Sequence, residues 1–291
     1  MIRLFAAGAV AFSLTMVGCA SDPASESTNG EPTIVVTTSV LGSLVREVVG
    51  DAAEVVTLIP DGADPHDWSP SAKDIEAMSQ ATVVVDNGLD LEANLRAPLE
   101  SAAADGASIF TVADHVTVRE TQSGQADPHV WMDPLTMREW IAPFATLLGE
   151  RGIDVRANAT AVEDGLTAWS GEVDAIVNAI PADRRKLVTG HDSMGYFAAR
   201  YGFEVVGAIN PSLTSQAEPS AADLAALSEQ VRTVGVPAIF AELGTPAAVA
   251  SAIAADTGAV VVELSTHQLP ADGTYRSFIL GIATTIADAL R

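Results

Sequence analysis

Residues 160–180, with the sequence TAVEDGLTAWSGEVDAIVNAI, decide how the chain is organised. Apolar residues recur there every three or four positions, which is the spacing of one buried helix face: Val162, Leu166, Trp169, Val173, Ile176, Val177 and Ile180. Thr160 and Glu163 have the spacing of a capping box at the helix start, and Pro181 marks the end. About 22 helical residues would reach roughly 33 Å. Because the stretch lies mid-chain, we expect residues 156–181 to form a linker helix between two lobes; an ordinary core helix within one lobe is the alternative.

Short apolar strands alternate with helical stretches on both sides of this helix. The expected strands are residues 34–36, 55–59, 82–85 and 108–110 before it, and 186–189, 204–209, 237–240 and 260–262 after it. A helical stretch at residues 135–150 leads into the long helix. Such alternation is typical of βαβ units and parallel sheets. About 260 residues are also too many for one simple core. We therefore predict an α/β fold with two lobes, residues 33–155 and 182–291.

The N-terminal residues are expected to lie outside the fold. Residues 1–18 have a minimal basic start and an apolar run too short to span a membrane as a mature helix, as in a signal peptide. The run ends in M-V-G-C, which resembles a bacterial lipobox, so Cys19 is the expected lipidated first residue; ordinary secretion with a free Cys19 is the alternative. Residues 19–32 are rich in Ser, Asp, Glu and Pro and predict a disordered, lipid-anchored tether. The protein should thus lie outside the cytoplasmic membrane, anchored to it through Cys19, and with only one cysteine it has no disulfide framework.

The chain is strongly acidic. It has 38 Asp and Glu residues against 15 Lys and Arg residues, for a formal net charge of −23. This charge argues against a nucleic-acid partner, because the phosphate backbone would be repelled. It is compatible with a cation as ligand, although solubility alone explains most of it.

Two similar motifs hold histidines in a stiff frame. Residues 64–68 read D-P-H-D-W and residues 127–131 read D-P-H-V-W. Each proline fixes its own φ and pushes the preceding residue into extended geometry, so His66 and His129 are aimed rather than mobile. Imidazole is the commonest metal ligand at neutral pH. Two of the five histidines of the chain in the same rigid frame therefore indicate a metal site.

Further candidate ligands follow the predicted strands. His66, His191 and Glu263 each follow a predicted strand at its carboxyl end, and His129 lies on a loop after another strand. In open α/β sheets, ligands bind beyond the carboxyl ends of the strands. These four residues are therefore predicted to lie at the same functional edge.

These motifs resemble those of the metal-binding subunits of bacterial zinc/manganese ABC transporters. The resemblance rests on five stretches and covers the mature chain: T-T-S-V-L-G-S-L from Thr37, G-A-D-P-H-D-W-S-P-S around His66, D-P-H-V-W-M-D-P around His129, G-H-D-S-M-G-Y-F around His191, and E-L-S followed by G-T-Y between Glu263 and Tyr275. It implies two Rossmann-like lobes joined by one long helix, with a metal bound in the cleft between them. It also implies His66, His129, His191 and Glu263 as metal ligands and an ABC permease in the membrane as partner. We expect a monomer.

The chain departs from the family pattern at two places. Family members usually have Asp where Glu263 stands, and zinc importers often carry a long His-rich loop ahead of the second motif, where this chain has only His115. We expect His115 and His267 to be surface residues. Glu242 resembles a family acid that could orient a ligand imidazole; a surface carboxylate is the alternative.

The predicted ligands suit zinc. Three imidazoles and one carboxylate complete a tetrahedral zinc shell. The family resemblance implies His at the place of His191 in zinc-type members and a carboxylate there in manganese-type members. Imidazole suits zinc, whereas carboxylate oxygens suit manganese. We therefore predict Zn²⁺ as the transported ion, with Mn²⁺ as the alternative. A zinc metallohydrolase would need an open metal position and a general base, and no H-E-x-x-H motif supports it, so we expect a binding protein and not an enzyme.

Overall fold

The computed structural model describes residues 31–121 and 123–291. The predicted signal peptide, Cys19 and nearly all of the predicted tether lie outside these residues. Within them, none of the helices combines the length and the apolar character needed to cross a membrane.

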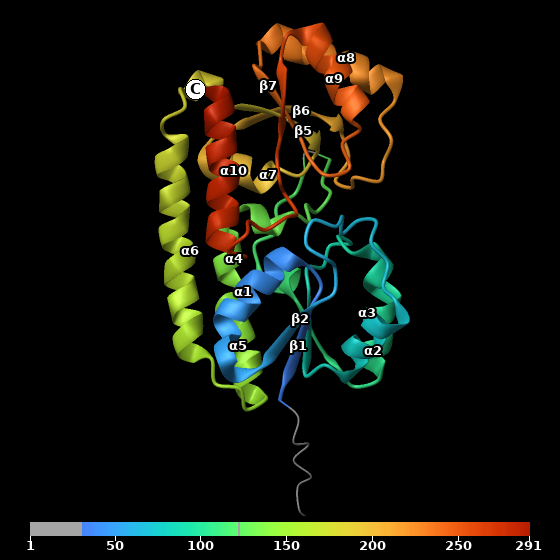
Figure 1. The fold of residues 1–291 in the computed structure, drawn as a ribbon, viewed down its shortest axis with the longest axis vertical. Helices are drawn as coiled ribbons and strands as arrows, with labels where there is room; N and C mark the ends of the chain where they lie inside the picture. Colours follow the sequence, from blue (N-terminus) through green and yellow to red (C-terminus); the bar gives the residue numbers. More distant parts are fainter. Residues whose placement is uncertain (1–30, 122) are drawn as a thin grey trace, which may run out of the picture. The chain divides into compact units, whose positions relative to one another are not determined.

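The first lobe is built on four parallel strands in the order β2-β1-β3-β4. Its strands are β1 (Thr33–Val36), β2 (Glu54–Thr57), β3 (Val83–Asp86) and β4 (Ser108–Thr111), and its helices are α1 (Ser39–Val49), α2 (Ala72–Gln80) and α3 (Arg96–Ala104). Ile34 and Val36 join one hydrophobic cluster and Val35 joins another, because successive side chains of a strand point to opposite faces. Helix α1 covers the first face, whereas α2 and α3 cover the second (Figure 1). Both faces of the sheet are therefore buried, as is usual for parallel sheets.

The second lobe repeats this topology with the order β6-β5-β7-β8. Its strands are β5 (Lys186–His191), β6 (Glu204–Asn210), β7 (Ala238–Ala241) and β8 (Val260–Glu263), and its helices are α7 (Gly195–Tyr201), α8 (Ala221–Val234), α9 (Ala247–Thr257) and α10 (Tyr275–Leu290). Leu187 of β5 faces the core shared with α7 and α10, and Val188 faces the core shared with α8 and α9. In both sheets the strand order reverses at the first strand. β2 lies on one side of β1 and β3 on the other, and β6 and β7 flank β5 in the same way, so the switch points lie between β1 and β3 and between β5 and β7. Ligands of such sheets bind beyond the carboxyl ends of the strands at this switch point.

One long helix, α6 (Arg156–Val177), connects the lobes. It packs against α1, α10 and the two helices before it, α4 (Pro134–Glu139) and α5 (Ile141–Glu150). Figure 1 shows α6 and α10 running side by side. A single hydrophobic cluster contains residues of both sheets and of α6, so the lobes share one continuous core.

Helix α6 begins at Arg156 and ends at Val177, whereas the range expected for the linker helix was 156–181. The capping-box prediction was wrong: Thr160 lies inside the helix and donates its hydroxyl to the Arg156 carbonyl at 3.0 Å instead of capping the helix. Ala159, one residue before Thr160, already packs in the core. The stretch at residues 135–150 is two helices that meet at Trp140, a fully buried residue.

Short 3-10 helices complete the described chain: η1 (Gly50–Ala52), η2 (Ala93–Leu95), η3 (Val112–His115), η4 (Val130–Met132) and η5 (Ala182–Arg184).

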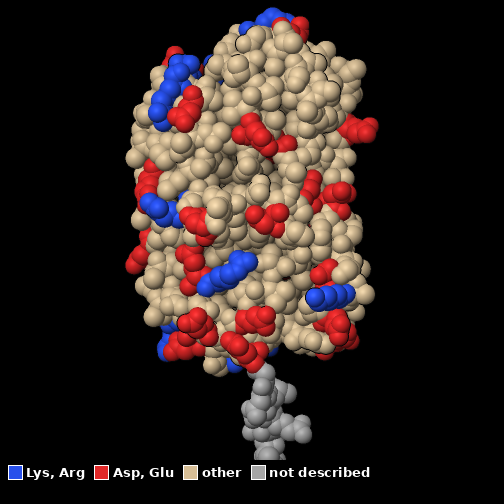
Figure 2. Space-filling model, in the orientation of Figure 1, with Lys and Arg blue, Asp and Glu red and all other residues tan. Residues whose placement is uncertain are grey.

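Acidic side chains are spread over the face shown in Figure 2, and basic ones are fewer there.

Candidate metal centre

The structure brings three predicted ligands together. His66 lies on the loop after β2, His129 directly precedes η4, and His191 is the last residue of β5. One ligand atom from each imidazole lies within 4.8 Å of those of the other two, and all three side chains are buried. The Nε2 atoms of His129 and His191 are 3.1 Å apart. The two lobes thus contribute imidazoles to one small polar centre.

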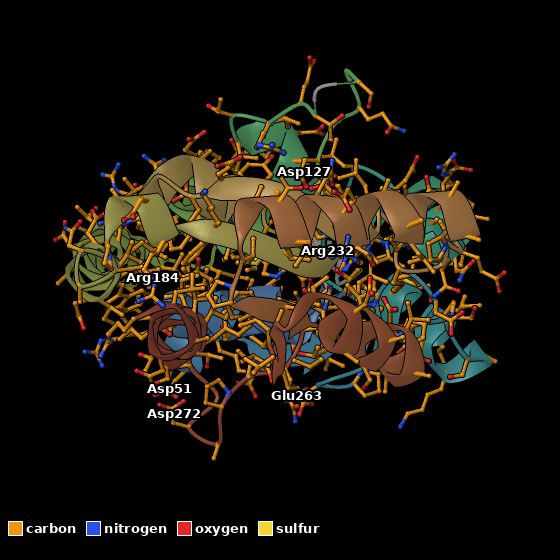
Figure 3. The ribbon with its side chains drawn as sticks, turned by 90° about the horizontal axis from the view of Figure 1, so that it is seen from above. Asp51, Asp127, Arg184, Arg232, Glu263 and Asp272 are labelled. Atoms are coloured by element: carbon orange, nitrogen blue, oxygen red, sulfur yellow. The ribbon has the colours of Figure 1, made fainter. Side chains whose placement is uncertain are left out.

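Glu263 lies elsewhere. It is the exposed final residue of the edge strand β8. Figure 3 shows it well apart from Asp127, the residue that contacts His129. The rule that sites lie at strand ends therefore fails for Glu263, because an edge strand ends away from the switch point.

The two D-P-H motifs form the same local turn. Asp64 Oδ1 accepts a hydrogen bond from the His66 backbone N–H at 3.0 Å, and Asp127 Oδ1 accepts from the His129 N–H at 3.1 Å. An aspartate that bonds the backbone two residues on fixes a turn. The motif therefore aims its histidine through the aspartate as well as through the proline.

Asp127 also orients the His129 ring. Its Oδ1 lies 2.8 Å from His129 Nδ1, and its Oδ2 accepts from Arg119 Nη1 at 2.8 Å. A proton on Nδ1 that is shared with this carboxylate leaves the lone pair on Nε2, which faces His191. Carboxylates that hold the second nitrogen of a ligand histidine are the usual partners of metal sites.

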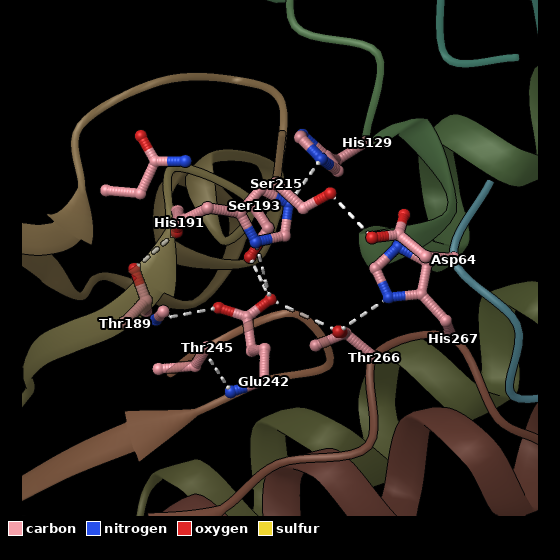
Figure 4. Close-up of polar contacts among 12 residues, drawn as sticks. Asp64, His129, Thr189, His191, Ser193, Ser215, Glu242, Thr245, Thr266 and His267 are labelled. Carbon is pink, nitrogen blue, oxygen red and sulfur yellow. Dashed lines mark hydrogen bonds and ion pairs between the residues drawn. The ribbon is translucent and has the colours of Figure 1, made fainter. Parts of the chain in front are cut away.

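Glu242 has the corresponding place beside His191. Its Oε2 lies 3.4 Å from His191 Nδ1 and accepts hydrogen bonds from Ser193 and Thr266 at 2.6 and 3.1 Å (Figure 4). Its Oε1 accepts from the Gly190 N–H at 3.2 Å. Burial raises the pKa of Glu242 to about 7. Of the two readings that the sequence left open for Glu242, the structure supports the buried partner of an imidazole.

The environment keeps the three imidazoles neutral. Burial lowers the pKa of His66 to about 4, with a further lowering by His191, and burial lowers the pKa of His191 to about 4 as well. Burial places the pKa of His129 well below its usual value. A metal binds the neutral imidazole, so these side chains are in the ligand form at neutral pH.

The prediction that His267 is a surface residue was wrong. His267 is buried, and its ring centroid lies 5.5 Å from that of Trp131 and 6.2 Å from that of His191. Its Nδ1 is 3.0 Å from Thr266 Oγ1. Its Nε2, like that of His66, finds no hydrogen-bond partner in the described part of the chain. Such a buried, unpartnered nitrogen is costly and calls for an explanation.

A sequence signal for His267 existed. It follows β8 by four residues, at the same end of the sheet as His191, but Glu263 appeared to fill that role. His115 is exposed, as predicted, and stacks on Phe110 with ring centroids 4.4 Å apart.

Two relatives of this chain are named for metal binding. The "Manganese-binding lipoprotein MntA" of Halalkalibacterium halodurans is 28% identical over 251 residues, covering 84% of this chain and 82% of that protein. The "Zinc-binding protein TroA" of Treponema pallidum is 29% identical over 225 residues, covering 75% of this chain and 72% of that protein.

Solved structures share the fold. The structure titled as the periplasmic zinc-binding protein TroA of Treponema pallidum superimposes with a TM-score of 0.80 and 25% identity, covering 90% of this chain and 99% of that one. A crystal structure of ZnuA superimposes with a TM-score of 0.77 and 26% identity, covering 90% of this chain and 100% of that one. The two parallel sheets and the long linker helix are thus confirmed as the fold.

A family model matches nearly the whole of the described chain, from residue 34 to residue 289. The family is described as a component of a zinc-uptake complex, and further relatives are named as substrate-binding lipoproteins of ABC transporters, so this chain is a binding component of a transporter and not an enzyme. The chain belongs to the family described as zinc-uptake complex component A, periplasmic.

Proposed function

We propose that this chain captures Zn²⁺ outside the cytoplasm with His66, His129 and His191 and delivers it to an ABC permease. The observation that carries the proposal is the convergence of three buried, neutral imidazoles from two lobes, with ligand atoms within 4.8 Å of one another. A site between lobes is typical of small-ligand binding. The family membership supports the transport role.

His267 replaces Glu263 as the fourth ligand in this proposal. Glu263 is exposed on an edge strand, whereas His267 is buried beside His191 with an unpartnered Nε2. Its unpartnered Nε2 is the nitrogen available to the ion, while Nδ1 is held by the Thr266 hydroxyl. Four nitrogens in a tetrahedral arrangement suit zinc.

Zinc is favoured over manganese by the kind of ligand atom. The group found among the described residues consists of imidazoles alone. Imidazole suits zinc, manganese prefers carboxylate and water oxygens, and zinc stands above manganese in the general order of affinity. Manganese is the second candidate, because the relative MntA is named for it.

The remaining parts of the proposal concern partners and location. The chain acts as a monomer that meets a membrane permease and does not bind nucleic acid. It is anchored to the cell membrane through a lipid on Cys19. Mass spectrometry of the mature N-terminal peptide checks the anchor: an unmodified Cys19, or cleavage elsewhere, would rule it out.

Competition calorimetry on metal-free protein tests the function. We expect zinc to bind, and an equal concentration of manganese to leave it bound. His66→Ala and His129→Ala should lose most of the zinc affinity and His267→Ala a smaller part, whereas the exposed controls Glu263→Gln and His115→Gln should keep it. Displacement of zinc by equal manganese would reject the metal assignment, and full affinity in the His66 and His129 variants would reject the site.

A further inference from the structure

One group of contacts between the lobes centres on the buried residues Asp133 and Trp131, with the partly exposed Arg200 as a partner. Arg200 of α7 donates to both carboxylate oxygens of Asp133 at 2.7–3.0 Å. Tyr275 donates its hydroxyl to the Trp131 carbonyl at 2.8 Å, and the Trp131 indole donates to the Thr266 carbonyl at 3.0 Å. These groups adjoin the core that the lobes share with α6 and α10. This side of the interface, which we call the closed side, cannot separate without breaking the core.

The second group is a small set of hydrogen bonds between loops. Ser215 donates its hydroxyl to Asp64 Oδ2 at 2.6 Å. Nearby, the Leu269 N–H donates to Asp61 Oδ1 at 2.9 Å, and the Gly62 N–H donates to the His267 carbonyl at 3.2 Å. Loop residues 61–64 are exposed or half-buried, as are residues 211–216. We call this side the mouth of the site, since no buried core has to open there.

A pocket leads from the mouth to a proposed ligand. Its volume is about 220 Å³, and its lining includes His191, Asn210, Ser215 and Gly244. Gly244 has a φ of +83°, and a Cβ there would lie 3.2 Å from Ser215 Cβ and 3.5 Å from Asp64 Oδ2. The backbone therefore passes close under the Asp64–Ser215 contact, at the point where the pocket meets the first lobe.

Asp64 connects this contact to His66. Its Oδ1 accepts from the His66 N–H and its Oδ2 accepts from Ser215, so one carboxylate holds both the turn that aims a ligand and the opposite loop. When the Ser215 contact breaks, the turn that carries His66 loses its tie to the loop of residues 211–219 and is held across the mouth by the contacts of Asp61 and Gly62 with residues 267–269. Opening of the mouth would then remove a ligand from the ion at the same time as it admits solvent.

We propose that Asp64 is a positioning residue that, through its hydrogen bond to Ser215, gates the exchange of the metal ion at the mouth, between residues 61–68 on one side and residues 211–219 and 267–269 on the other. This rests on the proposed function, since it assumes that the ion binds at His66, His129 and His191. The closed side stays intact during exchange, and the ion enters and leaves by loop movement. Asp64 does not contact the ion in this proposal. It acts by holding the turn of His66 and by controlling the access of solvent and ions to the site.

Stopped-flow kinetics of zinc uptake and of zinc release to a chelator test the gate. Ser215→Ala keeps the Asp64–His66 turn and removes the contact between loops, and Ser215 is only partly buried, so folding should be unaffected. We expect both rates to rise by about tenfold, because a lost hydrogen bond to a charged group makes opening more frequent. The equilibrium affinity should change much less than either rate. Ser215→Thr, which keeps a hydroxyl, should restore the wild-type rates.

Ser212→Ala is the matched control. It removes the same group from the same loop, but Ser212 Oγ accepts from the Thr214 N–H within the loop and does not reach Asp64. Wild-type rates are expected for it. Unchanged rates in Ser215→Ala, or an equal acceleration in Ser212→Ala, would overturn the gate. Failure of the wild-type protein to bind zinc would instead reject the proposed function, so the two failures are distinguishable.

Discussion

At the scale of single residues, the centre depends on carboxylates that do not face the ion. Asp127 and Glu242 each lie beside the Nδ1 of a candidate ligand, and both are buried. Their positions follow from the backbone: Asp127 belongs to the turn before His129, and Glu242 follows β7 at the switch point next to His191. The ring orientation of both imidazoles is therefore set before any ion arrives.

Asp127→Asn should weaken zinc binding by about 10–100-fold, the usual effect of removing a partner of a ligand histidine. The amide cannot hold the imidazole in the same protonation state as the carboxylate does. Competition titration against a zinc chelator measures the change. Asp67→Asn, at an exposed acid beside His66, is the control and should have no effect; an equal loss in both variants would contradict the orienting role.

Acid should destabilise the metal-free protein through His66. The pKa of His66 is about 4 in the folded state and 6.5 ordinarily, so between these values the unfolded chain binds more protons. Stability from this residue is therefore present above pH 6.5 and is lost as the pH falls towards 4. The loss reaches roughly 3 kcal/mol, at 1.36 kcal/mol per unit of pKa.

His66→Gln cannot take up this proton, so its stability relative to the wild type should rise as the pH falls. Urea denaturation at pH 7 and pH 4.5 measures the difference. Burial raises the pKa of Asp127 to about 6 and of Glu242 to about 7, so these two carboxyls make the folded protein more stable as the pH falls. Both are present in the wild type and in His66→Gln, so their effect cancels in the difference in stability between the two proteins. A constant difference at both pH values would contradict the assignment of His66 as a buried neutral imidazole.

At the scale of elements, the sequence predicted most of the fold because the inner strands β1, β3, β5 and β7 are buried on both faces and the helices on one. Such burial leaves continuous apolar runs and three-four spacing in the sequence. The same logic placed His191, whose strand β5 lies inside the sheet at the switch point. The position of Glu263 could not be predicted in this way. It depends on whether β8 is an edge strand, and the spacing of apolar residues along the sequence does not reveal the order of the strands in the sheet.

His267 was missed for a related reason. It is brought back towards the centre by a loop whose path is set by long-range contacts, such as the Trp131 indole on the Thr266 carbonyl and the Thr266 hydroxyl on Glu242. Contacts between residues more than a hundred positions apart leave no local pattern. The D-P-H motifs, in contrast, are local turns, and so the sequence was sufficient for them.

Helix α6 supplies the clearest test at this scale. Leu166 is fully buried in the shared core, so Leu166→Ala should lower the free energy of unfolding by about 2–5 kcal/mol. The exposed neighbour Thr167 is the control, and Thr167→Ala should change it by less than about 0.5 kcal/mol. Chemical denaturation followed by fluorescence and by circular dichroism should give one coincident transition for both lobes. Two separate transitions would show that the core is not continuous.

At the scale of the whole described unit, residues 31–291, the interface between the lobes is fixed on one side and loosely held on the other. The fixed side includes α6, α10 and the Arg200–Asp133 pair. Domain closure of the hinge kind needs a few residues that absorb large backbone changes. A continuous core beside a 22-residue helix opposes such a hinge.

The radius of gyration should therefore hardly change on zinc binding. Small-angle X-ray scattering of the metal-free and zinc-saturated protein measures it. We expect nearly equal values, because movement is confined to the loops at the mouth. A large contraction with zinc would reject the rigid interface, whatever the binding affinity.

Helix α10 has a consequence for the order in which the protein can be made. Its residues Phe278, Ile282 and Ile286 belong to the same core as Ile34, the second residue of β1, and α10 contacts α1 as well as α6. A polypeptide emerging from the ribosome can complete this shared core only once residues 275–290 have been synthesised. The last helix of the chain is therefore also the last part of the core that joins the two lobes.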